Sequence, residues 1–190
     1  NVLDNISPFF TFVPNDTVLS VDSSLCGAYY FFPLAEAEDN GSVVISSNIS
    51  SGSFFALGST TITFTATDLA NNQITTSFNI TVIDDEEPVV TFVPDDVVIA
   101  ECLNPVIFDL PQGIDNCSDV SILQVSGIES NSIFPVGTTI NEFALSDGNG
   151  NTTYVSFNVT VLEQINLTPI LIDPLCQSDS AINLLTLNYF

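Results

Sequence analysis

An internal repeat of about 80 residues is the feature that most constrains how this chain can fold. The sequence Thr-Phe-Val-Pro at 11–14 recurs at 91–94, and the pattern Phe-Asn-x-Thr-Val at 78–82 recurs at 157–161. The copies keep their order, and their offset stays near 80 residues throughout. Because each copy has the length of a small domain, the repeat predicts two consecutive domains of one fold.

The predicted domain boundaries follow from where the two copies begin and end. We expect the first domain at 1–84 and the second at 85–163, joined by an acidic run that ends in Pro88. After Glu163 the pattern breaks, so 164–190 is predicted to begin a further module or to form a terminal extension. These 27 residues are too few to fold alone.

Alternation with a period of two indicates β-strands within each copy. In residues 61–67 the apolar Ile62, Phe64 and Ala66 alternate with threonine, which puts an apolar face on a core and a polar face in water. Residues 77–82 alternate in the same way, and the Asp and Asn residues between the two segments are typical of a hairpin turn. Roughly seven short strands in about 80 residues is the scale of an immunoglobulin-like domain. The chain is therefore predicted to be all-β, with tandem immunoglobulin-like β-sandwiches.

The charge is entirely of one sign, with 23 Asp and Glu residues and no Lys, Arg or His, for a net charge of −23. Nucleic acids and anionic membrane surfaces are bound by cations, so neither is an expected partner. Membrane insertion is not expected either, since no stretch approaches the ~18 apolar residues of a membrane span. Without His or Lys there is no imidazole base, no Schiff base and no Ser-His-Asp triad. We therefore predict no catalytic residue and no enzymatic activity.

Several segments resemble the hyalin repeat, an immunoglobulin-like module of extracellular adhesive proteins. They are Pro88 after the acidic junction, Asp-Asn-Cys-Ser at 115–118, and the segments 134–139, 147–151 and 157–161. The resemblance covers about 160 residues and implies a secreted cell-surface protein that acts in cell adhesion, of the tandem kind common in Bacteroidota. The residues after Glu163 resemble the opening strand of another immunoglobulin-like module.

The four cysteines allow three complete pairings. The resemblance implies a disulfide between Cys102 and Cys117, which would close a loop of about 15 residues and contribute roughly 3 kcal/mol. Cys26 corresponds to Cys102, but Gly41 stands where its partner would be, so we expect Cys26 to be a buried free thiol rather than to form a long-range bridge to Cys176. Cys176 is expected to pair outside the chain. A disulfide implies an oxidising, extracytoplasmic location.

Calcium is the one cofactor that the acidic residues suggest. Asp84, Asp85 and Glu86 lie at the domain junction, where a hard cation could gather carboxylate ligands. Asp147, Asn149 and Asn151 have the alternate spacing of calcium-binding loops, although the Gly and Glu of an EF-hand loop are missing. The alternative at the two places is a solvated acidic linker and a hairpin turn closed by an Asp side chain.

Two kinds of glycosylation signal occur in the chain. Asn15 and Asn48 begin sequons of the form Asn-x-Ser/Thr, which would carry glycans in a eukaryotic host. In a bacterium such residues are better explained as polar residues on the wet faces of strands. Thr17 and Ser180 lie in Asp-Thr-Val and Asp-Ser-Ala, which resemble a short O-glycosylation signal of Bacteroidota.

The function hypothesis combines the repeat, the resemblance and the charge. We expect a structural spacer or fibre-forming repeat of a cell-surface adhesin, since like-charged domains repel one another and keep a tandem array extended. Its partners would be neighbouring repeats of the same polypeptide, other copies in a fibre, or an extracellular glycan or surface ligand. The alternative is a carbohydrate- or ligand-binding accessory module of a secreted enzyme.

Overall fold

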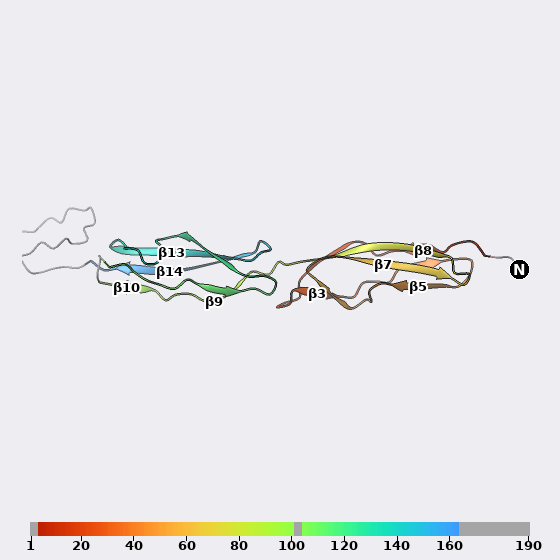
Figure 1. Cartoon of the computed structure of the whole chain (residues 1–190), viewed down its shortest axis with the longest axis horizontal. Helices are drawn as coiled ribbons and strands as arrows, with labels where there is room; N and C mark the ends of the chain where they lie inside the picture. Colours follow the sequence, from red (N-terminus) through yellow and green to blue (C-terminus); the bar gives the residue numbers. More distant parts are fainter. Residues whose placement is uncertain (1–3, 101–103, 164–190) are drawn as a thin grey trace, which may run out of the picture. The chain divides into compact units, whose positions relative to one another are not determined.

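The computed structural model describes residues 4–100 and 104–163, which form two compact units (Figure 1). The first unit contains the described residues up to Glu86 together with Asp115–Ser118. The second contains Glu87–Ile114 and the described residues from Asp119 onwards. Every regular element in the described part is a β-strand, so the prediction of an all-β chain is confirmed. The predicted module or extension at 164–190 lies outside the described residues.

The first unit is a sandwich of eight strands. Their bounds are β1 (Phe9–Phe12), β2 (Thr17–Ser20), β3 (Gly27–Tyr30), β4 (Glu36–Glu38), β5 (Val43–Ser47), β6 (Ser53–Ala56), β7 (Gly58–Asp68) and β8 (Gln73–Ile83). A four-stranded sheet has the order β2-β8-β7-β5, and two short sheets pair β1 with β4 and β3 with β6. The long β7–β8 hairpin forms the centre of the larger sheet, and β2 pairs with β8 in parallel.

The core of the first unit follows the alternation in the sequence. Ile62, Phe64 and Ala66 of β7 are buried, as the period of two predicted, while the threonines between them are more exposed. The ring of Phe32 lies edge-on to that of Phe64, and their centroids are 6.2 Å apart. Each fully buried aromatic or aliphatic side chain of this kind contributes about 1.5–3 kcal/mol through the surface it removes from water.

The second unit repeats this architecture. Its strands are β9 (Val89–Phe92), β10 (Val97–Ile99), β11 (Gln112–Ile114), β12 (Ser121–Ser126), β13 (Gly137–Ser146) and β14 (Thr152–Val161). The larger sheet has the order β10-β14-β13-β12, with β10 parallel to β14, and β9 pairs with β11. Stacked rings of Phe143 and Phe157 lie 6.0 Å apart in its core, as those of Phe64 and Phe78 lie 6.1 Å apart in the first.

A repeated aspartate explains why the motif Thr-Phe-Val-Pro is followed by an acid in each copy. Asp16 accepts a hydrogen bond from the backbone N–H of Asn79 at 2.7 Å. In the second unit Asp96 accepts one from the N–H of Asn158 at 2.7 Å and another from its side-chain amide at 3.0 Å. These bonds join the start of β2 or β10 to the last strand of each sandwich. The side-chain and backbone hydrogen bonds from Asn158 hold the pKa of Asp96 below its ordinary value.

Candidate functional site

A disulfide joins Cys26 to Cys117, with 4.7 Å between the Cα atoms and 91 residues between the cysteines in the sequence. The prediction that Cys117 pairs with Cys102 and that Cys26 is a free thiol is therefore wrong. Cys102 and Cys176 lie outside the described residues. On the chain-entropy model, closing a loop of this length contributes roughly 4–5 kcal/mol, more than the short loop expected from the sequence.

The position of Asp115–Ser118 gives the physical reason for this pairing. Although the repeat places this segment in the second copy, it belongs to the first compact unit. The side-chain amide of Asn116 donates a hydrogen bond to the carbonyl oxygen of Leu25 at 2.8 Å, and Cys117 packs against the first core. Asp115 accepts bonds from the N–H groups of Cys117 and Ser118 at 2.8 and 3.0 Å, which closes the segment into a turn. Cys117 is thereby held beside Cys26.

The acids at the predicted domain junction make hydrogen bonds within the first unit. Asp85 accepts one from the hydroxyl of Ser20 at 2.6 Å, and Glu86 accepts one from the backbone N–H of Ser24 at 3.2 Å. Asp84 accepts a bond from the N–H of Glu86 at 3.2 Å. These contacts give the carboxylates a structural role in ordering the end of the first unit, and calcium binding by Asp84, Asp85 and Glu86 stays a prediction.

The carboxylate of Asp147 closes the hairpin between β13 and β14. It accepts bonds from the N–H groups of Asn149, Gly150 and Asn151 at 2.7–2.9 Å, and from the side-chain amide of Asn151 at 2.6 Å. Burial alone would raise the pKa of Asp147, but these hydrogen bonds outweigh it and hold the pKa below its ordinary value. Gly150 takes a φ of 109°, which only glycine adopts without strain. The geometry has the form of the turn weighed as the alternative, and calcium at Asp147, Asn149 and Asn151 stays a prediction.

The predicted glycosylation residues that the structure describes lie at the surface of the first unit. Asn15 is exposed, and its carbonyl oxygen accepts a bond from the hydroxyl of Thr17 at 3.1 Å. Asn48 is also exposed, but its side-chain amide donates to the carbonyl oxygen of Thr61 at 3.1 Å, and its side-chain oxygen accepts from the N–H of Thr63 at 2.8 Å. Asn48, the first residue after β5 (Val43–Ser47), therefore links this end of the strand to β7 through its side chain. Ser180 lies outside the described residues.

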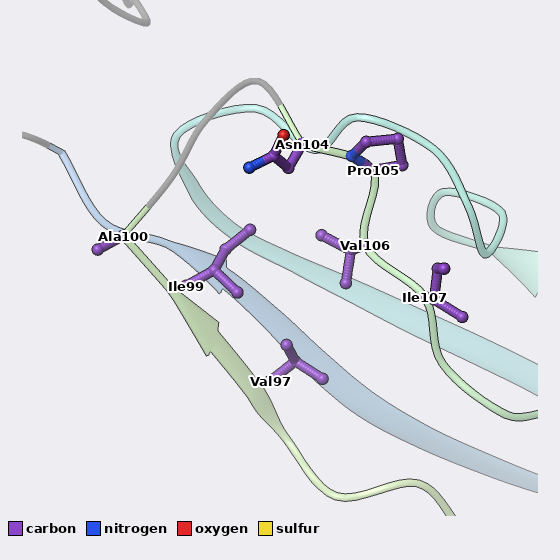
Figure 2. Close-up of a pocket in the computed structure, with 7 residues that line it drawn as sticks. All are labelled: Val97, Ile99, Ala100, Asn104, Pro105, Val106 and Ile107. Atoms are coloured by element: carbon purple, nitrogen blue, oxygen red, sulfur yellow. The ribbon is translucent and has the colours of Figure 1, made fainter.

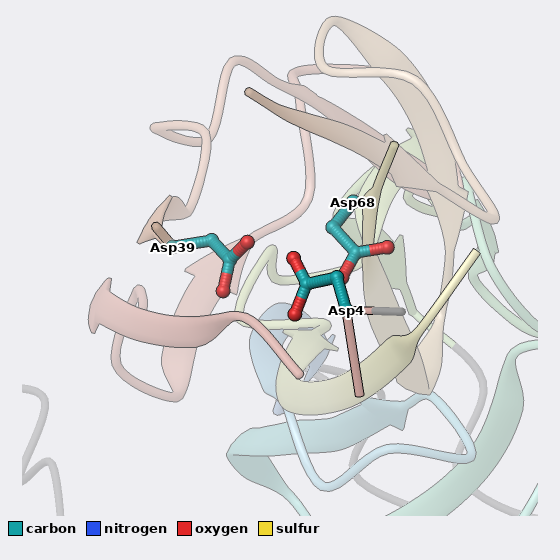
Figure 3. A group of neighbouring side chains, drawn as sticks. All are labelled: Asp4, Asp39 and Asp68. Carbon is teal, nitrogen blue, oxygen red and sulfur yellow. The ribbon is translucent and has the colours of Figure 1, made fainter. Parts of the chain in front are cut away.

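Sequence reasoning missed a group of three aspartates in the first unit: Asp4, Asp39 and Asp68 (Figure 3). Asp4 precedes β1, Asp39 directly follows β4, and Asp68 is the last residue of β7. One carboxylate oxygen from each lies within 4.8 Å of the others. No motif could have identified the group, because its members are about 30 residues apart in the sequence and only the fold brings them together.

An apolar pocket of about 440 Å³ lies in the second unit (Figure 2). It is lined by Val97, Ile99, Ala100, Asn104, Pro105, Val106 and Ile107. Val97 and Ile99 of β10 face Val106 across it, and Asn104 supplies the polar side chain at one end. None of these seven residues is titratable, so the pocket lining offers no general acid, general base or nucleophile.

Aromatic side chains are exposed on the outer face of the β3–β6 sheet. Tyr29 lies opposite Phe54 in the register, and their rings meet edge-on with centroids 5.1 Å apart. Phe31, two residues beyond Tyr29, is 79% exposed. Exposed aromatic side chains beside one another are the kind of surface on which a sugar ring or an apolar partner group can rest.

Fold and candidate sites together define a class: tandem immunoglobulin-like sandwiches that carry a disulfide and acidic loops, as in modules of adhesive proteins outside the cell. The family model described as "HYR domain" matches residues 3–82 and 84–161. The chain therefore belongs to the HYR domain family, as its resemblance to the hyalin repeat predicted. Membership of this family confirms the prediction of an extracellular or cell-surface location.

Three similar proteins illustrate the comparison. The chain is 29% identical to rat "Sushi, von Willebrand factor type A, EGF and pentraxin domain-containing protein 1" over 88% of its own length and 5% of that protein. It is 30% identical to "Hyalin" of Strongylocentrotus purpuratus over 88% of the chain and 15% of that protein. With "Hyalin" of Lytechinus variegatus the identity is 29%, over 90% of the chain and 34% of the relative. These relatives are animal proteins, so they give no support to a Bacteroidota-type origin.

Among solved structures, Drosophila N-cadherin EC1-3 is similar, with a TM-score of 0.47 and 14% sequence identity over 80% of this chain and 65% of that one. Among the residues that the structure describes, no helix has the length and hydrophobicity that a membrane crossing requires.

Proposed function

We propose that this chain is a structural spacer or fibre-forming segment of a larger extracellular adhesive protein and that it carries no catalysis. The observation that carries the proposal is the duplication of one fold. Each unit has its own four-stranded sheet, its own buried core and its own pair of stacked phenylalanine rings. Repeated modules with separate cores lengthen a polypeptide without needing a ligand to fold.

The charge supports the same proposal. A net charge of −23 with no cationic side chain makes neighbouring modules repel one another, which favours an extended array and solubility. A chain without Lys or Arg also offers no cleavage site to trypsin-like proteases outside the cell.

The relatives are much longer than this chain. The chain spans only 5–34% of the length of the curated relatives described above, so the role of a whole parent protein is part of the proposal. As partners we propose neighbouring repeats of the same polypeptide and further copies of it in a fibre.

A binding screen tests the spacer function. The purified chain, labelled at its C-terminus, would be applied to an array of extracellular glycans and matrix proteins at physiological ionic strength. A spacer shows no saturable binding to any array component, and a labelled control sandwich of similar charge shows none either. Saturable binding to one class of component at micromolar or lower concentration would reject the pure spacer function.

The exposed aromatic face of the first unit favours a second candidate, the ligand-binding module. If Tyr29, Phe31 and Phe54 contact a glycan or another surface ligand, the array signal is lost when Tyr29 is replaced by Ala. It persists in Tyr154→Ala, which removes an exposed tyrosine of the second unit. A signal that survives Tyr29→Ala would place binding elsewhere and reject this face as the site.

A further inference from the structure

We propose that Asp4, Asp39 and Asp68 bind a calcium ion in the first unit. This inference is independent of the proposed spacer function, because it rests on the three carboxylates alone. Figure 3 shows their carboxylate groups turned towards a common space, although they come from three separate segments of the sandwich.

The spacing of the carboxylates matches the size of a calcium coordination sphere. One oxygen from each residue lies within 4.8 Å of the other two. Calcium binds oxygen ligands at about 2.3–2.6 Å, so two ligands on opposite sides of the ion are about 5 Å apart. Magnesium requires a near-ideal octahedral shell at about 2.0–2.1 Å and keeps several of its waters, so a site built from protein carboxylates suits calcium better.

The carboxylate of Asp39 gives independent evidence for a bound cation. Both of its carboxylate oxygens are buried, and neither has a hydrogen-bond partner. A buried, unpaired carboxylate is strongly unfavourable, and native proteins satisfy such groups with a donor, a proton or a metal. In Figure 3 the carboxylate of Asp39 points towards that of Asp4, where a bound cation would satisfy it.

The chain itself cannot neutralise the negative charge of the three aspartates. It has no Lys, Arg or His at any of its 190 positions, so no side chain can form an ion pair with the three acids. Two means of relieving the repulsion remain, namely protonation and a bound cation. A bound divalent cation relieves the repulsion of all three carboxylates at once, and oxygen ligands of this kind are those that calcium prefers.

Hydrogen bonds from Asn72 hold the carboxylate of Asp68 in place. It accepts hydrogen bonds from the N–H of Asn72 at 2.8 Å and from the Asn72 side-chain amide at 2.7 Å. The same Asn72 amide also bonds the carbonyl oxygens of Asp4 and Ile6, at 3.3 and 3.1 Å. Asn72 therefore fixes the segment that carries Asp4 next to Asp68.

The internal repeat gives a second reason to single out these residues. Aligning the two copies puts Asp84, Asp115 and Asp147 at the positions of Asp4, Asp39 and Asp68. All three acids are kept, although most of the residues next to them differ. Acids that only served solubility would not have to stay at three corresponding positions.

The experiment measures calcium binding by the full chain and by two variants with the same change in charge. Asp39→Asn removes the buried carboxylate, and Glu38→Gln removes the exposed carboxylate beside it. Thermal unfolding is recorded in EDTA, in calcium chloride and in sodium chloride of matched ionic strength. The side-chain amide signal of Asn72 is followed by NMR during a calcium titration, which locates binding in the first unit.

We expect calcium to raise the melting temperature of the wild-type first unit by about 10 °C or more at 100 times its dissociation constant. Matched sodium chloride gives a smaller rise. Glu38→Gln keeps the calcium effect and the Asn72 shift, whereas Asp39→Asn loses the shift and has a higher melting temperature than wild type in EDTA. The proposal is overturned if calcium acts no differently from sodium, or if Asp39→Asn keeps the Asn72 shift unchanged.

Discussion

Cys26 and Cys117 form a disulfide across 91 residues of sequence, with their Cα atoms 4.7 Å apart. The bond ties Asp115–Ser118, a segment of the second sequence copy, into the first compact unit. Asn116 supports it by donating a hydrogen bond to Leu25, next to Cys26. If each sequence copy formed a complete domain by itself, no segment of the second copy would belong to the first unit. The boundaries of the two sequence copies therefore differ from those of the two compact units, because Asp115–Ser118 belongs to the second copy but to the first unit.

The first prediction concerns the energetic weight of this bond. Cys117→Ser is expected to destabilise the first unit by roughly 4–5 kcal/mol, because the unfolded chain regains the entropy of a long open loop. Chemical denaturation of wild type and variant under non-reducing conditions measures the change. Cys102→Ser is the control and should leave the same transition in place. Equal losses of stability in the two variants would contradict the pairing. So would a non-reducing peptide map, made with a protease other than trypsin, that links Cys102 to Cys117.

A second prediction tests the core. Phe64→Ala is expected to cost about 3–5 kcal/mol, since it leaves a cavity among the rings of Phe32 and Phe78. Phe31→Ala removes the same side chain from a position that is 79% exposed, so its cost should stay within about 0.5 kcal/mol. Urea unfolding of the two variants gives the comparison. A similar cost for the two substitutions would show that burial does not set their contribution.

A third prediction follows from the lowered pKa of Asp96. Because the folded state lowers this pKa below the ordinary 3.8, the ionised group stabilises the fold above that value, and the stabilisation is lost as the pH falls through the folded pKa. Asp96→Asn should therefore melt below wild type at pH 7, and the gap should close towards pH 2.5. Asp95→Asn, which changes an exposed neighbour, corrects for net charge. A gap that stays constant over this range would rule out the contribution of Asp96.

The sequence could predict those parts of the fold that depend on local patterns. Period-two alternation identified Ile62, Phe64 and Ala66 as core residues, because a strand must turn successive side chains to opposite faces. The hairpin turn at Asp147 was predictable for a similar reason, since an Asp side chain reaches the N–H groups two to four residues ahead of it.

The sequence could not predict contacts that depend on the whole fold. The resemblance put the partner of Cys117 in the same copy, whereas the segment around Cys117 packs on the first core. The group formed by Asp4, Asp39 and Asp68 has no spacing motif, because its three segments meet only when β1, β4 and β7 are assembled. Both misses concern residues far apart in sequence whose proximity follows from packing rather than periodicity.

The most direct test of the disulfide-tied fold is to pull the full chain from its two ends and measure its unfolded length. While the Cys26–Cys117 disulfide is oxidised, it keeps the 91 residues of the closed loop out of the extended chain. Adding a reductant should therefore lengthen the unfolded chain by about 300 Å, at roughly 3.3–3.6 Å per residue. The oxidised chain should also resist force longer before its first unit unfolds. Equal unfolded lengths with and without reductant would contradict the account of a disulfide-tied structural repeat.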